Sequence, residues 1–180
     1  MAIDLPQSVK EQLTQISCGI PGASWMTPDR LHLTLRFIGE VDGGRFRDVS
    51  DALREVNGDA FELTLKGVGH FPPRKDPEVV WVGVEKNDTL TQLHNRIESV
   101  LARAGVDRDS RKFAPHVVLA RLHRTPVARV AGFLAEHGLL RFEPFPVTMF
   151  FLYSSVLSSQ GALHQVESEY LLNGKGIFTE

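Results

Sequence analysis

The sequence has one cysteine, two tryptophans and two tyrosines among its 180 residues. The single cysteine, Cys18, cannot form a disulfide within the chain, which is typical of a protein kept in a reducing compartment. The most apolar stretches, 79–84 and 147–152, are much shorter than the roughly 20 residues that a membrane span needs. Asp4 and Pro6 interrupt the apolar residues at the N-terminus, which argues against a signal peptide. We therefore expect a cytoplasmic protein without a membrane segment.

An excess of charge of one sign is also lacking. Lys and Arg total 20 against 22 for Asp and Glu, so the formal net charge is −2 and no overall positive field attracts nucleic acid. Phe accounts for 11 aromatic residues, against 2 Trp and 2 Tyr, which fits core filling better than an exposed surface for base stacking. With 42% hydrophobic residues, the chain is long enough for one globular domain or two small lobes.

Hydrophobic periodicity predicts alternating helices and strands. Each expected helix carries an apolar stripe at three- to four-residue spacing and is bounded by Gly, Pro, Asn or Asp. We expect Asp88 to cap the helix that Gly105 closes. The expected helices are 7–16, 43–56, 88–104 and 127–137, and the expected strands are 31–37, 61–68, 79–84 and 115–121.

Two of the expected strands carry a histidine, and the elements around them occur in the same order. His32 and His116 lie 84 residues apart, and each strand follows a helix and a loop and precedes another helix. This favours a duplicated unit of about half the chain over a chance similarity of short motifs. Two related lobes would place the two histidine strands face to face.

The residues beside the histidines predict acid–base chemistry. In a regular strand His32, Thr34 and Arg36 share one face while the leucines between them face the core. The strand of His116 is apolar throughout, and only its pairing with His32 marks it as functional. An imidazole can gain or lose a proton near pH 7. Two of them suit in-line displacement at phosphorus, in which one takes a proton from water and the other protonates the leaving oxygen. Such a reaction requires neither a protein nucleophile nor a metal.

Thr34 and Arg121 are the expected ligands of the phosphate oxygens, because a hydroxyl and a guanidinium stabilise charge that builds on them. Arg121 lies five residues after His116, an offset that places it on the opposite face of a regular strand. Its role therefore requires a bulge or the end of the strand. The remaining histidines are expected to be structural: His70, His94, His123, His137 and His164.

Segments 32–40 and 115–121 resemble the two His-x-Thr-x motifs of the two-histidine phosphoesterases. Within that superfamily the chain is similar to the bacterial and archaeal RNA 2′,3′-cyclic phosphodiesterases, once called 2′-5′ RNA ligases. The resemblance extends over most of the chain and includes segments 2–6, 67–72, 80–84 and 152–155. It implies an α+β fold in one domain, 1–180, made of two interleaved lobes related by a pseudo-two-fold axis. In such a fold two mainly antiparallel sheets form a V-shaped cleft, with helices on the outer faces.

The resemblance also implies an activity and the role of each site residue. The family opens a 2′,3′-cyclic phosphate at an RNA end to leave a 2′-phosphate, without metal or cofactor, and weakly runs in reverse to join 2′-5′ linked RNA. By this resemblance His32 is the proton donor, His116 is the proton acceptor, and Thr34 and Arg121 hold the phosphate. Val118 stands where the family usually has Thr or Ser, so one hydroxyl is missing from the second motif.

Two alternatives remain at this point, and neither involves an obligate protein partner. The substrate is either an RNA end or a small cyclic phosphate, such as a nucleotide or an ADP-ribose cyclic phosphate. Basic side chains would contact RNA, unless they are only solvated charges. Val118 also leaves open a noncatalytic descendant that binds RNA or a nucleotide. The expected RNA contacts are Arg36, Arg74, Arg111 and Lys112.

Overall fold

The computed structural model describes residues 1–158 and 161–173. Four α-helices, one short 3₁₀ helix and ten strands alternate along this part of the chain. In chain order they are β1 (Ala2–Asp4), α1 (Gln7–Ile16), β2 (Ala23–Trp25), η1 (Pro28–Arg30), β3 (His32–Thr34), α2 (Gly43–Leu53), β4 (Phe61–Leu63), β5 (Leu65–Phe71), β6 (Val79–Val84), α3 (Asp88–Arg103), β7 (His116–Leu122), α4 (Val127–His137), β8 (Phe145–Val147), β9 (Met149–Ser158) and β10 (Gly161–Leu171).

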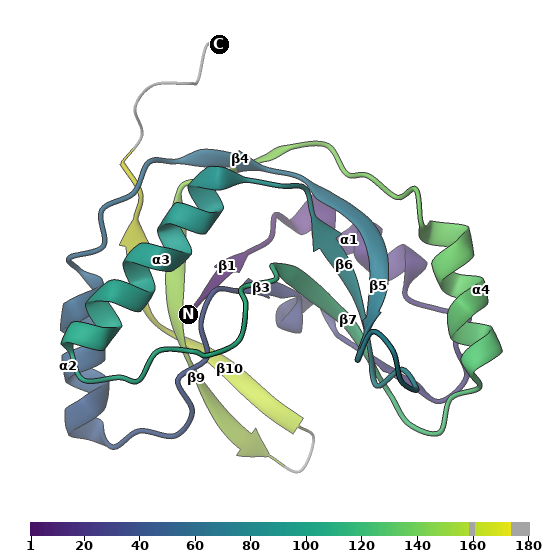
Figure 1. Ribbon diagram of the computed structural model, residues 1–180, viewed down its shortest axis with the longest axis horizontal. Coiled ribbons are helices and arrows are strands. Elements are labelled where there is room, and N and C mark those ends of the chain that lie inside the picture. The colour runs from purple at the N-terminus through teal and green to yellow at the C-terminus, as the bar shows by residue number, and fades with distance from the viewer. Residues whose placement is uncertain (159–160, 174–180) are drawn as a thin grey trace.

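One bent, eight-stranded antiparallel sheet runs through the molecule (Figure 1). Its order is β10-β9-β1-β3-β7-β6-β5, with β2 paired to β7, and β4 and β8 form a separate two-stranded sheet. The expected α+β fold with antiparallel sheets is therefore confirmed. The large sheet contains both histidine strands, because β3 pairs with β7.

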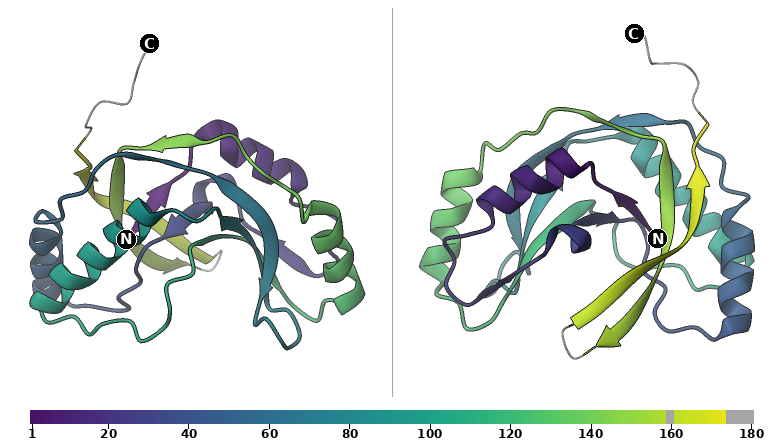
Figure 2. Two further views of the ribbon diagram at one scale, coloured as in Figure 1. Left: turned by 45° about the horizontal axis from the view of Figure 1, so that its top comes forward. Right: turned by 180° about the vertical axis from the view of Figure 1, so that it is seen from behind.

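The four α-helices lie outside the large sheet, as expected (Figures 1 and 2). Helices α2 and α3 flank the side of β9 and β10, and α1 and α4 flank the side of β5 and β6. The Tyr170 hydroxyl on β10 donates a hydrogen bond of 3.0 Å to the Ser50 carbonyl oxygen on α2. Among the residues described, no helix has the length and apolar character that crossing a bilayer requires. Helix α3 buries its apolar stripe almost completely: Leu90, Leu93, Ile97 and Leu101.

Two helix boundaries differ from the expected ones. Asn87, not Asp88, is the N-cap of α3: its backbone is extended, and its side-chain oxygen accepts a hydrogen bond of 2.9 Å from the Leu90 N–H. Asp88 is already helical, and its negative charge in the first turn is favourable at this helix end. Helix α2 ends at Leu53, earlier than the position of Asn57 indicated.

The strand expected over 31–37 is regular only as far as Thr34. The N–H groups of Leu35 and Arg36 both donate to the Met1 carbonyl oxygen, at 2.9 and 3.2 Å, so two residues face one, as in a β-bulge. The alternation of faces fails after this point. Arg36 turns inward and is 9% exposed, whereas Phe37 turns outward and is 67% exposed. Arg36 therefore does not share the solvent face of His32.

We predict that Leu33→Ala destabilises the whole molecule. Leu33 is fully buried in the middle of the large sheet, where it pairs with Ile3 on β1 and Val117 on β7. The substitution should lower the free energy of unfolding by about 2–5 kcal/mol, measured by denaturant unfolding. Leu139→Ala is the matched control, because Leu139 is 99% exposed and should change stability by less than about 0.5 kcal/mol. Equal stabilities of the two variants would contradict the prediction.

Candidate active site

The pairing of β3 with β7 determines which side chains meet at the middle of the large sheet. Leu33 pairs with Val117, and both side chains are fully buried. Their neighbours in each strand point to the opposite face, because successive side chains alternate. The four motif residues that share this other face are His32, Thr34, His116 and Val118.

The same register fixes the arrangement of these four residues. One step on either side of the Leu33 pair, Thr34 lies across from His116, and His32 lies across from Val118. The two histidines are therefore diagonal neighbours, whose Cβ atoms lie roughly 7–8 Å apart in a regular antiparallel pair. Two imidazoles at this separation can reach a phosphoryl group from opposite sides.

A bulge in β7 brings Arg121 to the face of His116. Consecutive residues of β6 pair with Ala120 and with Val118, so Leu119 is an extra residue in β7. The extra residue shifts the alternation by one position. Arg121 is consequently exposed on the face of His116 instead of turning into the core. The bulge that the phosphate-binding role of Arg121 requires is present.

The surroundings of His116 orient its ring and select its tautomer. The Nδ1 atom lies 2.7 Å from the carbonyl oxygen of Ala114, and a carbonyl can only accept, so Nδ1 carries the hydrogen. In the neutral ring the lone pair is then on Nε2, as a proton acceptor requires. The edge of Phe71 and the ring of Trp81 contact the imidazole, with centroids 5.0 and 6.1 Å away.

Two glycines make room for the Trp81 ring beside His116. A Cβ atom on Gly69, which faces Trp81 across β5 and β6, would lie 2.3 Å from the indole Cζ2. A Cβ atom on Gly83 would lie 3.2 Å from Cζ3 of the same ring. The indole therefore lies over the positions where these side chains would project and forms part of the support of His116.

His32 has acidic and aromatic neighbours from two other strands. Asp4 on β1 pairs with His32, and the Tyr153 ring on β9 stacks on the imidazole with centroids 5.9 Å apart. Burial, followed by the negative charges of Asp4 and Glu169, raises the pKa of the Tyr153 phenol to about 12. Tyr153 therefore stays protonated and uncharged beside His32 at neutral pH. The Asp4 carboxylate also forms an ion pair of 2.7 Å with Lys10.

Two of the four expected RNA contacts hold ion pairs with carboxylates. The buried Arg36 guanidinium is paired with Glu98, so we do not retain Arg36 as an RNA contact. Arg111 is exposed, but its Nε and Nη2 atoms donate to the Asp109 carboxylate at 3.0 and 2.8 Å. These hydrogen bonds hold the pKa of Asp109 well below its usual range, so the pair is ionised and largely neutral as a unit.

The other two expected RNA contacts are exposed in separate loops. Lys112 precedes the His116 end of β7. Arg74 lies in the loop between β5 and β6, which adjoins the opposite end of β7, because Val79 pairs with Arg121. Lys112 and Arg74 therefore lie in the loops at the two ends of β7.

Phe37 is a functional candidate that motif reading did not single out. It follows His32 by five residues, as Arg121 follows His116, and a bulge precedes each of them. The side chain is 67% exposed, which is unusual for a phenylalanine. The equal offset in the two halves of the chain is the signal that could have identified it.

Two surface hollows lie away from His32 and His116. One, of about 480 Å³, is between α3 and residues 55–57, which follow α2, and includes Arg96 and Arg103. The other, of about 400 Å³, is between α1 and α4 and includes Cys18 and His137. Within 1–158 and 161–173 no three His, Cys, Asp or Glu side chains come together in a way that could hold a metal ion.

The chain matches a family model described as LigT like Phosphoesterase. The model matches twice, over residues 3–81 and over residues 82–164, and each match contains one histidine strand. The antiparallel α+β fold and the paired histidine motifs are those of a two-histidine phosphoesterase. The chain belongs to the LigT-like phosphoesterase family.

Similar proteins cover almost the whole chain. A Thermotoga maritima protein named RNA 2′,3′-cyclic phosphodiesterase is 33% identical over 182 residues, which is 97% of this chain and 95% of that protein. An Archaeoglobus fulgidus protein of the same name is 31% identical over 92% of this chain and 94% of its own. Escherichia coli LigT in complex with 3′-AMP is 29% identical, with a TM-score of 0.75 and 95% coverage of both chains.

We predict that Gly69→Ala displaces Trp81 and weakens the support of His116. The new methyl group would overlap the indole ring, and overpacking of this kind costs about 1–3 kcal/mol of stability. Denaturant unfolding and near-ultraviolet circular dichroism would measure the two effects. Gly132→Ala is the control: Gly132 is exposed inside α4 with free space around it, and alanine there should stabilise by about 0.5–1 kcal/mol. Gly69→Ala with unchanged stability and spectrum would refute this account of Trp81.

Proposed function

We propose that this protein hydrolyses 2′,3′-cyclic phosphate ends of RNA to 2′-phosphate ends, without a metal, by paired-histidine acid–base catalysis. The observation that carries the proposal is the diagonal placement of His32 and His116 on one face of the sheet, fixed by the pairing of Leu33 with Val117. The names of the curated relatives agree with this substrate class. The 3′-AMP complex of E. coli LigT shows that a protein of this fold holds a nucleotide.

His116 is the proton acceptor in the proposed reaction. Its Nδ1–H is held by the Ala114 carbonyl oxygen, which leaves Nε2 to take a proton from the attacking water. The oxygen of that water forms a bond to phosphorus. The charge that builds on the non-bridging oxygens is stabilised by the Thr34 hydroxyl, which lies across from His116, and by the Arg121 guanidinium.

His32 is the proton donor in the same step. As the bond from phosphorus to the 3′ oxygen breaks, the imidazolium gives its proton to that oxygen, leaving a 3′ hydroxyl and a 2′-phosphate. The Tyr153 ring stacked on His32 keeps the imidazole plane in place. When a 5′ hydroxyl takes the place of water, it gives its proton to His116 and bonds to phosphorus while the 3′ oxygen leaves with the proton from His32, which gives a weak 2′-5′ ligation.

Phe37 is the group best placed to hold the terminal nucleoside. It projects from a bulge five residues after His32, as Arg121 does after His116. An exposed aromatic ring stacks on nucleobases. Any base can stack in this way, so the site would accept RNA ends of varied sequence.

An RNA end is favoured over a small cyclic nucleotide by the basic loops at the two ends of β7. Lys112 and Arg74 are exposed there and can contact phosphates beyond the terminal one. The number of such contacts is small, because Arg36 and Arg111 are paired with carboxylates. We place the activity in the cytoplasm, where the exposed free thiol of Cys18 would stay reduced.

Removal of either histidine tests the mechanism. We predict that His32→Ala and His116→Ala each lower kcat by about a hundredfold or more, because each deletes one proton-transfer group. The assay uses an oligonucleotide ending in a 2′,3′-cyclic phosphate, in EDTA, with the product phosphate located at the 2′ or 3′ position. His123→Ala is the control, since His123 is exposed beyond the end of β7 and should retain wild-type kcat.

Three results of this assay would count against the proposal. Full activity of either histidine variant would exclude paired catalysis, and loss of wild-type activity in EDTA would exclude a metal-independent reaction. A cyclic mononucleotide assayed alongside tests the substrate. Equal or faster turnover of the mononucleotide at every salt concentration would favour the small cyclic phosphate over RNA.

Val118→Thr tests whether the missing hydroxyl limits the reaction. Val118 lies across from His32, and threonine has nearly the same shape but can donate to a phosphate oxygen. A hydrogen bond to a charged group contributes about 1.5–3 kcal/mol, so we predict a gain of about tenfold or more in kcat/KM. Val118→Ala, which adds no hydroxyl, should show no gain.

The same pair of variants separates an enzyme from a noncatalytic binder. If the wild type binds the cyclic phosphate without forming product and only the Val118→Thr variant turns it over, the protein is a noncatalytic binder. A Val118→Thr variant no faster than the wild type would mean that another group already supplies the hydrogen bond.

A further inference from the structure

We propose that His94, together with the buried Arg36–Glu98 ion pair, positions His116 by holding the segment 107–114 against the end of the His32 strand. These residues lie outside both histidine motifs. The inference rests on the proposed role of His116 as proton acceptor, and it adds the group that orients this residue. The groups act on His116 through the carbonyl oxygen of Ala114 and are positioning residues, without contact to the reacting atoms.

His94 connects the two motif segments directly. Its Nδ1 atom lies 3.1 Å from the carbonyl oxygen of Leu35, which belongs to the end of the His32 strand, and must donate there because a carbonyl only accepts. Its ring stacks on Phe113 with centroids 3.9 Å apart and planes within 4° of parallel. Phe113 immediately precedes Ala114. One side chain of α3 therefore contacts both the end of the His32 strand and the segment that leads into the His116 strand.

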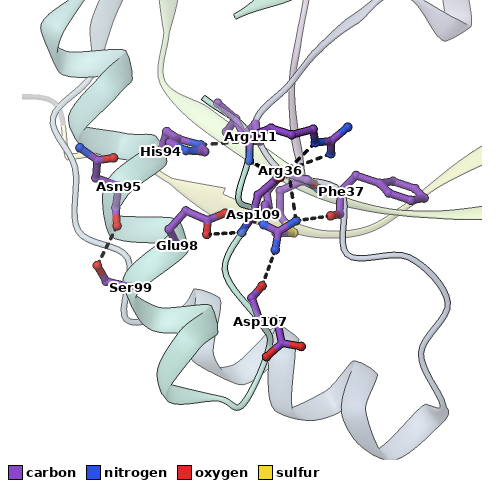
Figure 3. Close-up of polar contacts among 11 residues, drawn as sticks. Arg36, Phe37, His94, Asn95, Glu98, Ser99, Asp107, Asp109 and Arg111 are labelled. Atoms are coloured by element: carbon purple, nitrogen blue, oxygen red, sulfur yellow. Dashed lines mark hydrogen bonds and ion pairs between the residues drawn. The ribbon is translucent and has the colours of Figure 1, made fainter. Parts of the chain in front are cut away.

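The Arg36–Glu98 pair holds the start of the same segment (Figure 3). Glu98 lies one helical turn after His94, and both side chains point from α3 toward Arg36. The Arg36 guanidinium is paired with the Glu98 carboxylate and also donates to the Asp107 carbonyl oxygen at 2.5 Å. The other carboxylate oxygen of Glu98 accepts from the Asp109 N–H at 3.3 Å.

These charges are buried, which makes the arrangement rigid. Arg36 and Glu98 are each 9% exposed, the two buried charged residues among the side chains described. A buried ion pair adds little net stability, because desolvation offsets the attraction, but it strongly disfavours geometries that separate the partners. The guanidinium also donates to the Phe37 carbonyl oxygen at 2.5 Å, so the same pair fixes the turn that exposes Phe37.

The contacts that hold segment 107–114 act on His116 through one hydrogen bond. Held at 107–109 by Arg36 and Glu98, and at Phe113 by His94, the segment presents the Ala114 carbonyl oxygen 2.7 Å from Nδ1 of His116. The partner of one ring nitrogen decides which nitrogen bears the hydrogen, and a wrong tautomer removes the lone pair from Nε2. A looser segment would let His116 adopt the tautomer that cannot accept the proton of water.

The test is to measure the tautomer of His116 by nitrogen-15 NMR of the imidazole signals, assigned with His116→Gln, in the full-length protein. In the wild type we expect hydrogen on Nδ1. In His94→Ala, which removes both the stack and the hydrogen bond, and in Glu98→Gln, which removes the charge, we expect a shift toward hydrogen on Nε2. We also expect kcat to fall by about tenfold with KM nearly unchanged, as on loss of an orienting partner.

His137→Ala is the matched control, because His137 is another helical histidine in contact with an aromatic ring, Phe133, but lies on α4. It should leave the His116 signals as in the wild type. His94→Phe keeps a ring beside Phe113 and loses only the N–H, so it decides the question if His94→Ala does not fold. Wild-type hydrogen on Nε2, or unchanged His116 signals in folded His94 and Glu98 variants, would overturn the proposal. An inactive wild type with the expected NMR shifts would instead refute the proposed function alone.

Discussion

The pair formed by Leu33 and Val117 joins the two histidine strands at the middle of the large sheet. Because both side chains are buried, the residues beside them must face the other way, and these are the motif residues. The packing of two apolar side chains thereby determines the spacing of two imidazoles. A slip of one residue would turn every motif side chain into the core. The slipped register is therefore disfavoured by the free energy of burying those polar groups.

Two backbone bulges expose side chains that a regular strand would bury. A perfectly alternating β7 would bury Arg121, and a perfectly alternating β3 would expose Arg36 and bury Phe37. The two bulges reverse these outcomes, so a guanidinium and an aromatic ring project beside the histidines. The two halves of the chain thus share a bulge after the histidine as well as an order of elements, but the bulge exposes a different side chain in each half.

The helices and the strands from β3 to β7 follow from the sequence, because their apolar patterns are clear and their ends carry Gly, Pro, Asn or Asp, whereas β1, β2, β8, β9 and β10 are not among the expected strands. The need for a bulge before Arg121 follows too, from the odd offset alone. The inward turn of Arg36 does not, because it depends on the Met1 carbonyl oxygen across the sheet and on Glu98, 62 positions further along the chain. The joining of both histidine strands into one sheet and the contact of His94 with two distant segments likewise depend on pairings that local patterns do not specify.

The position of β1 has a consequence for how the chain folds during synthesis. β1 lies between β3 and β9, so the second edge of β1 is covered only after β9, far later in the chain, has been made. β1 can pair with β9 only when residues near Phe151 have emerged, whereas β5, β6 and β7 are neighbours both in the sheet and along the chain. Until β9 has emerged, a nascent chain carries an exposed β1 edge, which is open to pairing with strands of other chains.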